Sequence, residues 1–249
     1  MKAMVLAAGL GTRLRPLTDD CPKALVEIAG RTLLDITLAR LRASGVREVM
    51  INVHHFADKV AEYLKANDNF GMRVEISREE ILLDTGGGLK QAAWFFLEDS
   101  EGDEPFILHN VDVLSTIDLS GMMRFHVRNR ALATLAVRDR KTSRYLLFDE
   151  HSALCGRRLG DDQTAEVVRR TQQVEPLAFS GIHVISPRVL PMMTEGGVFS
   201  IITSYLRLAG RGEKIVGFRD DQYYWRDLGK PENLKRAAED VIQETVRLP

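Results

Sequence analysis

Three cations follow the first apolar segment of the chain, within a short loop that contains two glycines. The stretch LAAGLGTRLRPLTDDCPKAL spans residues 6–25 and carries Arg13, Arg15 and Lys23. Glycines at positions 9 and 11 allow backbone N–H groups to approach a ligand closely, which phosphate oxygens require. A guanidinium can bind two phosphate oxygens at once, whereas an ammonium acts as a point charge. These residue types indicate a phosphate-binding loop, although a glycine turn with solvated cations remains open on the loop alone.

Two common glycine-rich nucleotide motifs do not fit this loop. A dinucleotide fingerprint GxGxxG needs glycine at position 14, where Leu14 stands. A mononucleotide P-loop needs GxxxxGK followed by Ser or Thr, which the loop does not contain. The loop therefore uses its glycines in another way.

The composition limits the classes of function. The 249 residues are 45% hydrophobic and 28% charged, and the formal net charge is -1. This balance gives no general attraction to nucleic acid or to anionic membranes, so we expect neither as a partner. No apolar run approaches the roughly 20 residues of a membrane helix. Two cysteines without CxxC spacing suit a reducing cytoplasm, which is the expected location.

Strand and helix patterns alternate over the first half of the chain and predict an α/β fold. The expected strands are 2–7, 46–53, 73–77 and 106–109, and the expected helices are 32–44, 56–64 and 89–97. Such βαβ units predict a Rossmann-like, doubly wound, mixed but mainly parallel sheet with helices on both faces. Binding residues then belong at the carboxyl ends of the strands.

The pattern changes after about residue 131. Strands are expected at 133–137, 144–148 and 178–185, with fewer helices between them, and a helix at 231–246 follows. No Pro/Ser/Gly-rich linker marks a boundary. We therefore expect a single domain over residues 1–249, extended by a mixed part of the sheet.

The loop resembles the signature of the sugar-1-phosphate nucleotidyltransferases. The pattern of that family is LAAGxGTRLxPLT, a short spacer and PK, and every fixed position of it is present here. The resemblance implies the nucleotide-diphospho-sugar transferase fold and a loop that wraps a nucleoside triphosphate. It also implies that Lys23 neutralises the reacting phosphates and that nucleotide binding involves Ala7, Ala8, Gly9, Gly11, Thr12 and Arg13.

Two acidic segments are similar to the metal-binding segments of this family. HNVD ends at Asp112 and is similar to the NxD segment, while WRD ends at Asp227 and is similar to WxDxGTP. The resemblance implies that both carboxylates bind catalytic Mg²⁺. Two strand ends of one sheet could bring them to one ion. A helix cap is the alternative for Asp112.

Two further segments concern the base and the sugar. In DTGGG, the resemblance implies that Gly86 and Gly87 lie against the nucleobase, although a helix start needing small residues is the alternative. AFSGI is similar to the FxGI element of the family, so Ser180 and Gly181 are expected beside the sugar.

The chain departs from many relatives before the FxGI element, where a glutamate-lysine pair is common. No lysine occurs between Lys141 and Lys214. The sugar phosphate is then expected to bind another basic residue: Arg144, Arg157, Arg158 or Arg169. This departure, with DTGGG, makes the chain most similar to the branch of N-acetylmuramate, mannose and heptose 1-phosphate nucleotidyltransferases.

The implied activity is formation of an NDP-sugar and pyrophosphate from a sugar 1-phosphate and an NTP, with UTP or GTP favoured. Small-molecule substrates are the expected partners, with a monomer or homodimer, and no hexapeptide-repeat β-helix domain is expected. A metal-dependent glycosyltransferase and a noncatalytic sugar-nucleotide sensor remain open. A choline-phosphate cytidylyltransferase remains open within the same chemistry.

Overall fold

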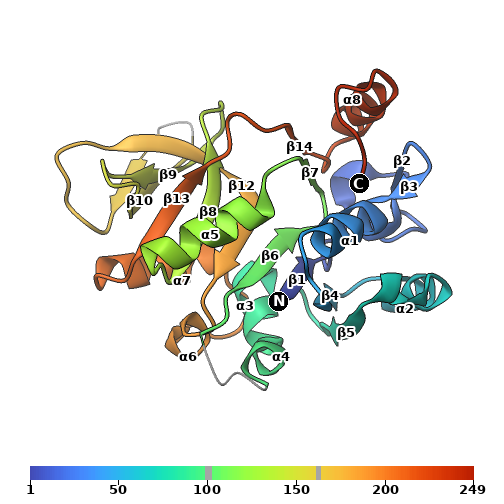
Figure 1. The fold of residues 1–249 in the computed structure, drawn as a ribbon, viewed down its shortest axis with the longest axis horizontal. Coiled ribbons are helices and arrows are strands. Elements are labelled where there is room, and N and C mark those ends of the chain that lie inside the picture. Colours follow the sequence, from blue (N-terminus) through green and yellow to red (C-terminus); the bar gives the residue numbers. More distant parts are fainter. Residues whose placement is uncertain (99–102, 161–163) are drawn as a thin grey trace. The chain divides into compact units, whose positions relative to one another are not determined.

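The computed structural model describes residues 1–98, 103–160 and 164–249, which form two compact units (Figure 1). The first unit comprises residues Met1–Leu83, Leu108–Ile117 and Tyr223–Pro249, and the second comprises Asp84–Ile107 and Asp118–Gln222. Strands and helices alternate in the first unit, whereas several strands follow one another without a helix in the second, and the sheet is mixed. The expected α/β class is confirmed.

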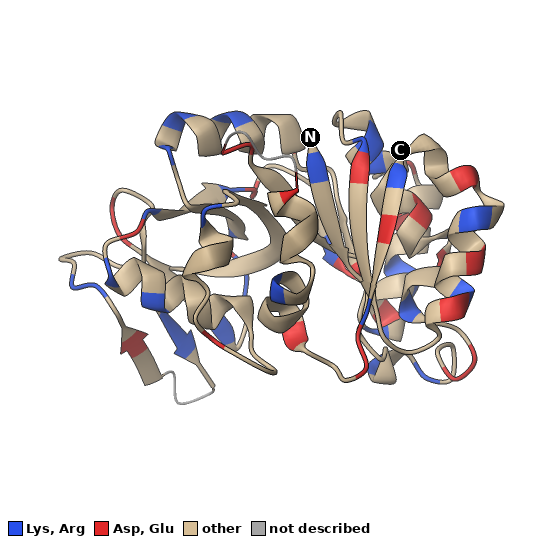
Figure 2. Cartoon of the chain, turned by 90° about the horizontal axis from the view of Figure 1, so that it is seen from below, with Lys and Arg blue, Asp and Glu red and all other residues tan. Residues whose placement is uncertain are grey.

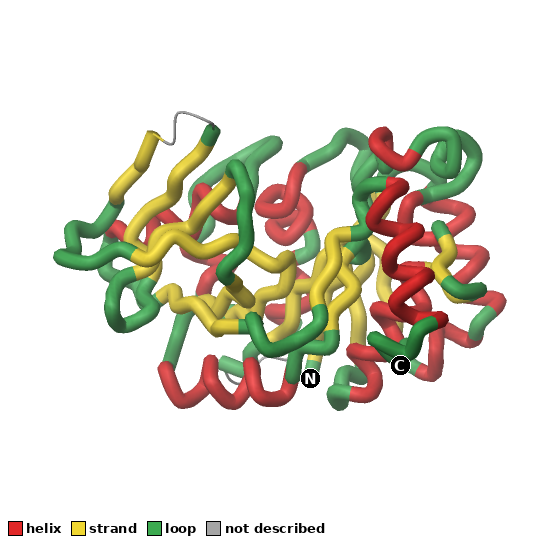
Figure 3. The backbone as a smooth tube through the Cα atoms, turned by 90° about the horizontal axis from the view of Figure 1, so that it is seen from above, coloured by secondary structure: helices red, strands yellow, loops and turns green. Residues whose placement is uncertain are grey.

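Parallel strands form the centre of the first unit. Strand β1 (Lys2–Leu6) pairs with β4 (Glu48–Val53), which pairs with β5 (Arg73–Arg78). Helices α1 (Leu33–Ala43) and α2 (Ala57–Ala66) connect these strands, and helices lie beside the strands in Figure 3. The βαβ arrangement expected from the sequence is present here.

The sequence explains the position of α1. Thr32 caps its first turn, because the Thr32 hydroxyl accepts a 3.0 Å hydrogen bond from the Asp35 amide. Leu34, Leu38 and Leu41 are completely buried. Burial of each leucine contributes about 1.5–3 kcal/mol, so this face fixes the helix against the core.

Short elements complete the first unit. They are η1 (Thr12–Leu14), η2 (Lys23–Leu25), β2 (Glu27–Ile28), β3 (Arg31–Thr32), η3 (Asp68–Gly71), β7 (Val113–Ser115), β14 (Trp225–Asp227) and α8 (Pro231–Ile242). Strands β7 and β14 pair with each other in antiparallel register. Helix α8 ends earlier than the expected residue 246.

The second unit contains a sheet with the strand order β11-β10-β9-β12-β8-β13. These strands are β8 (Ala133–Arg138), β9 (Arg144–Phe148), β10 (Leu154–Leu159), β11 (Thr164–Val167), β12 (Glu175–Ile185) and β13 (Ile215–Arg219). Neighbours are antiparallel except β8 and β13, which are parallel. The predicted strands correspond to β8, β9 and β12, whereas the other three were not predicted.

The helices of the second unit are more numerous than expected. They are α3 (Asp84–Gln91), α4 (Ala93–Leu97), α5 (Leu119–Asn129), α6 (Val189–Met192) and α7 (Ile201–Gly210). The expected helix 89–97 is interrupted between α3 and α4. Strand β6 (Phe106–Asn110) leads out of this unit into the first one.

Charges are distributed over the whole ribbon. Acidic and basic positions are interspersed along the helices in Figure 2, in keeping with the near-zero net charge. Among the described residues, no helix is long and apolar enough to cross a membrane.

Candidate active site

The glycine-containing loop begins directly after β1 and is folded on itself. Gly11 has a φ of 66°, a conformation that favours glycine. A Cβ at this position would lie 2.9 Å from Cγ2 of Thr18 and 3.2 Å from Cβ of Lys23. The Thr18 hydroxyl also donates a 2.8 Å hydrogen bond to the Gly11 carbonyl. Gly11 therefore allows the loop to close and places Lys23 beside it.

Lys23 forms an ion pair with Asp112. The ammonium group contacts Oδ2 of Asp112, and the two side chains are only 12% and 17% exposed. The amide of Val111 donates a 3.1 Å hydrogen bond to the Leu6 carbonyl, which places the Asp112 segment at the end of β1. Two residues predicted to act together are thus adjacent.

Strand pairing brings Asp227 to the same place. In the β7–β14 pair, Asp227 lies opposite Val113, and the Leu228 amide donates a 2.8 Å hydrogen bond to the Asp112 carbonyl. Asp227 also accepts a 2.7 Å hydrogen bond from the Gly229 amide. One antiparallel pair therefore holds the backbones of Asp112 and Asp227, which are far apart in the sequence, next to each other.

The guanidinium of Arg13 and the carboxylate of Asp227 both lie close to Gly229. A Cβ on Gly229 would lie 2.6 Å from Nη2 of Arg13 and 2.9 Å from Oδ1 of Asp227. Any side chain at this position would have to displace one of the two. The structure thus places Arg13, Lys23, Asp112 and Asp227 around one end of the first unit.

A buried polar network supports the start of the loop, and sequence reasoning missed it. The Ala7 amide donates a 2.8 Å hydrogen bond to Oδ1 of Asn52, whose amide group donates to Oε1 of Glu79 at 2.6 Å. The Leu83 amide donates to the other carboxylate oxygen of Glu79 at 3.0 Å. Asn52 and Glu79 are 3% and 4% exposed. This network fixes the backbone of the loop to the ends of β4 and β5.

The histidines near the loop have structural contacts. Nδ1 of His54 lies 2.8 Å from the Glu79 carbonyl, and the His55 ring contacts that of Phe56. Burial lowers the pKa of His109 to about 4, so this residue is neutral near pH 7. In the described part of the chain, no three His, Cys, Asp or Glu side chains form a cluster that could hold a metal ion.

The second unit gives Gly86 a packing role. Gly86 lies in the first turn of α3, where its amide donates a 2.9 Å hydrogen bond to the Phe199 carbonyl. A Cβ on Gly86 would lie 2.4 Å from the Phe199 ring and 2.9 Å from the Ile201 amide nitrogen. The helix-start alternative therefore has a physical basis at Gly86. The nucleobase role of Gly86 and Gly87 stays a prediction.

Ser180 and Gly181 lie in a bulged part of β12, where the pairing with β8 shifts between Phe179 and His183. Ser180 is completely buried, and its hydroxyl lies near the carboxyl group of Asp220. Burial raises the pKa of this carboxyl group. The Ser180 hydroxyl therefore lies in the interior of the second unit. Its contact with the sugar stays a prediction.

Two of the four candidate arginines of the second unit, Arg157 and Arg158, have different surroundings. Arg157 forms a 2.7 Å ion pair with Glu166, and the guanidinium of Arg158 lies 4.9 Å from the Tyr145 ring centroid. A residue that sequence reasoning missed, Arg140, contacts the FxGI element directly. Nη2 of Arg140 donates a 3.0 Å hydrogen bond to the Phe179 carbonyl. Arg140 is therefore an additional candidate for the sugar phosphate.

Comparison with known families identifies the chain. The family model described as nucleotidyl transferase matches residues 2–148, which include the loop and Asp112. The chain belongs to the nucleotidyl transferase family. The expected resemblance to sugar-1-phosphate nucleotidyltransferases is confirmed by its relatives.

Two of these relatives show how far the similarity extends. This nucleotidyl transferase is 35% identical over 249 residues to the N-acetylmuramate alpha-1-phosphate uridylyltransferase of Caulobacter vibrioides, covering 97% of both chains. It is 29% identical to the mannose-1-phosphate guanylyltransferase of Mycobacterium tuberculosis, covering 97% of this chain and 64% of that protein.

Solved structures share the fold. The UDP-glucose pyrophosphorylase of Acinetobacter baumanii is 17% identical, with a TM-score of 0.79 over 100% of this chain and 95% of that one. HddC of Yersinia pseudotuberculosis, solved in complex with GMP-PN, is 21% identical, with a TM-score of 0.74 over 96% and 98%. The expected fold is therefore confirmed.

Proposed function

We propose that this nucleotidyl transferase makes an NDP-sugar and pyrophosphate from a sugar 1-phosphate and a nucleoside triphosphate. The observation that carries the proposal is the gathering of Lys23, Asp112 and Asp227 at the end of β1, with Arg13 beside Asp227. Two cations and two carboxylates suit phosphoryl chemistry, which depends on positioning and charge neutralisation.

The reaction balances without a protein nucleophile. An oxygen of the sugar 1-phosphate attacks the α-phosphorus of the triphosphate, and the bond from that phosphorus to the bridging oxygen breaks. Pyrophosphate leaves with the electron pair. The attacking phosphate is already ionised, so no general base is needed. Lys23 and Arg13 neutralise charge on the α-phosphate and on the leaving pyrophosphate.

The donor set fits a magnesium ion. Mg²⁺ is usually bound by one or two carboxylates together with substrate phosphates, and Asp112 and Asp227 are the two carboxylates here. In the structure the Asp112 carboxylate contacts the Lys23 ammonium, so a bound ion would have to share this carboxylate with Lys23 or displace it. When bound, the ion would supply additional charge neutralisation at the reacting phosphates.

We propose UTP and N-acetylmuramate 1-phosphate as the first substrate pair. The support is the full-length similarity to a relative that bears this name. GTP with mannose 1-phosphate is the second candidate, because a relative with that specificity is 29% identical over 97% of this chain. In both cases Gly87 and the Gly181 backbone are the candidate contacts for base and sugar, and Arg140 is a candidate for the sugar phosphate.

A panel of four triphosphates against several sugar 1-phosphates, with Mg²⁺, tests the proposal. We expect pyrophosphate release that requires both substrates, and an NDP-sugar detected by ³¹P NMR in equal amount. A glycosyltransferase would instead consume an NDP-sugar and release a nucleotide without pyrophosphate. A sensor would bind the sugar nucleotide without turnover. Either result would contradict the proposed function.

A further inference from the structure

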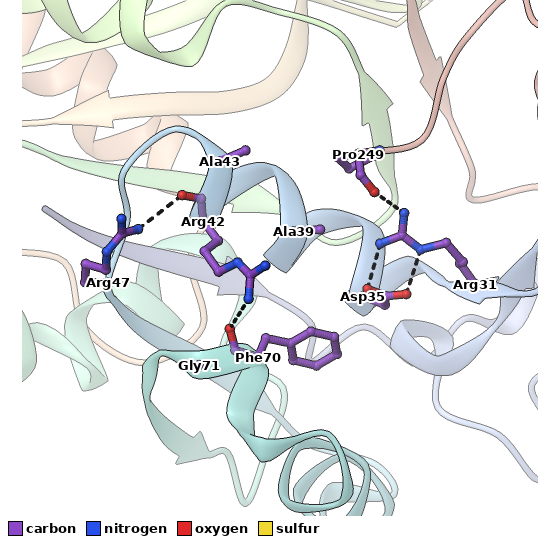
Figure 4. A pocket seen from close by; sticks show the side chains of 9 residues that line it. All are labelled: Arg31, Asp35, Ala39, Arg42, Ala43, Arg47, Phe70, Gly71 and Pro249. Atoms are coloured by element: carbon purple, nitrogen blue, oxygen red, sulfur yellow. Dashed lines mark hydrogen bonds and ion pairs between the residues drawn. The ribbon is translucent and has the colours of Figure 1, made fainter.

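A cavity of the first unit lies at the opposite end of the parallel strands from the glycine-containing loop. It has a volume of about 550 Å³ and is lined by Arg31, Asp35, Ala39, Arg42, Ala43, Arg47, Phe70, Gly71 and Pro249 (Figure 4). Arg47 precedes β4 and Gly71 precedes β5, whereas Asn52 at the far end of β4 contacts the loop. Six residues of strand separate the two ends by about 20 Å.

The lining carries an excess of positive charge. Its charged side chains are three arginines and one aspartate. Arg31 binds Asp35 through two hydrogen bonds of 2.8 Å and also contacts the Pro249 carbonyl, so the charge of Arg31 is compensated within the lining. In the described part of the chain, Arg42 and Arg47 have no carboxylate within ion-pair distance. Two uncompensated guanidinium groups therefore face one cavity.

Backbone carbonyls orient these two guanidinium groups. Nη1 of Arg42 donates a 3.0 Å hydrogen bond to the Phe70 carbonyl, and Nη1 of Arg47 donates to the carbonyls of Arg42 and Val46 at 3.2 and 2.9 Å. Each guanidinium has five N–H donors in a planar fork, so several donors stay available. Such groups suit phosphate oxygens.

The remaining lining is apolar and includes an aromatic ring. Ala39 and Ala43 lie one turn apart on α1, and Phe70 lies on a separate turn below this helix in Figure 4. The turn that carries Phe70 has φ values of 49° at Asp68, 47° at Asn69 and 56° at Phe70. Non-glycine residues rarely adopt this conformation, and it concentrates at sites that hold ligands.

We propose that this cavity, the α1 pocket, is a second site that binds a nucleoside diphosphate group. The diphosphate would bind Arg42 and Arg47, and the base would lie on the Phe70 ring above the alanines. The cavity volume lies within the range of small-molecule sites. The proposal goes beyond the proposed function, because the α1 pocket contains none of the catalytic residues.

Titration with UDP in EDTA, followed by ¹³C-methyl alanine NMR, tests the α1 pocket directly. The methyl groups of Ala39 and Ala43 report on this pocket, whereas those of Ala7 and Ala8 report on the catalytic loop. We expect saturable shifts of the Ala39 and Ala43 signals with their own binding curve. Absent or unsaturable shifts at these two alanines would overturn the proposal.

Charge-matched variants distinguish specific binding by Arg42 and Arg47 from a nonspecific attraction of UDP to positive charge. We expect Arg42→Ala with Arg47→Ala to weaken the Ala39 binding curve by at least about tenfold, since hydrogen bonds to charged groups are lost. The Ala7 curve should stay unchanged. The control Lys235→Ala with Arg236→Ala removes the same charge from exposed positions on α8. Equal weakening by this control would overturn the proposal.

Two further measurements test whether the pocket binds the nucleoside as well as the diphosphate. They do not depend on the folding of the arginine variants. Ala39→Phe fills the pocket without changing its charge, and we expect it to abolish the UDP-induced shift of Ala43. Inorganic pyrophosphate should bind the pocket at least about tenfold more weakly than UDP. Equal binding of both would contradict a nucleoside site. None of these measurements requires turnover, so they remain informative if the proposed function fails.

Discussion

Gly9 offers a test in which the expected effects on ligand binding and on stability have opposite signs. A Cβ placed on Gly9 meets no described atom within 4 Å, and its φ is outside the left-handed region. Alanine at such a position usually stabilises a protein by about 0.4–1 kcal/mol, because it restricts the unfolded chain. Gly9→Ala should therefore leave the fold intact or slightly more stable.

The same methyl group should hinder the triphosphate. If the phosphates approach the backbone at Gly9, an added methyl occupies a close contact, and overpacking of this kind costs about 1–3 kcal/mol. That corresponds to roughly tenfold to hundredfold weaker binding. Calorimetric titration with UTP, beside thermal melting, measures both quantities for Gly9→Ala.

Gly196 provides the matched control. It is also exposed and lies outside the left-handed region, and a Cβ added to it would meet no described atom within 4 Å. Gly196→Ala should change stability in the same way without affecting UTP binding. Unchanged UTP affinity in Gly9→Ala, or an equal loss in Gly196→Ala, would refute the assignment of the loop.

Three other outcomes follow from the site and its surroundings. Lys23→Ala should lower kcat more than triphosphate affinity, because its charge acts where charge accumulates in the transition state; a raised KM with unchanged kcat would make it a ground-state binder. Asp240→Ala removes the acceptor of a 2.6 Å hydrogen bond from Arg226 next to Asp227, so kcat should fall about threefold to tenfold and the melting temperature should drop. An Arg207 hydrogen bond lowers the pKa of Glu195 to about 2, so the stability that this pair contributes above pH 4.5 should be lost as the pH falls toward 2. Urea unfolding at pH 6 and pH 3 should show that Glu195→Gln removes this dependence, and equal losses in both proteins would contradict it.

Elements with a clear period were predictable from the sequence. The three leucines on one face predicted α1, and all three are completely buried. Helix α7 was missed, because its run IITSYLRLAG is short and rich in apolar residues, and short apolar runs do not distinguish strand from helix. Strand β10 was missed because Gly156 and two arginines interrupt its pattern. Gly156 is required there, since a Cβ would lie 2.4 Å from the Glu166 carbonyl oxygen.

Residues of the candidate site were predictable from the sequence only where they belong to a recognisable motif. Lys23 and Asp112 belong to recognisable segments, and the structure pairs them. Asn52 and Glu79 belong to no sequence motif. They meet only because β4 and β5 pair in parallel register, which the local sequence does not reveal. The contact of Gly86 with Phe199 likewise depends on the packing of α3 against α7. Such partners follow from tertiary structure and have no local signal.

The turnover of Asp112→Asn and Asp227→Asn, measured as pyrophosphate release with Mg²⁺, tests the central claim most directly. Each substitution keeps the size of the side chain and removes the charge that we propose to act on the reacting phosphates. We predict that both variants melt as cooperatively as the parent protein and turn over at least about a hundredfold more slowly. Near-native turnover in either folded variant would contradict the assignment of these two carboxylates.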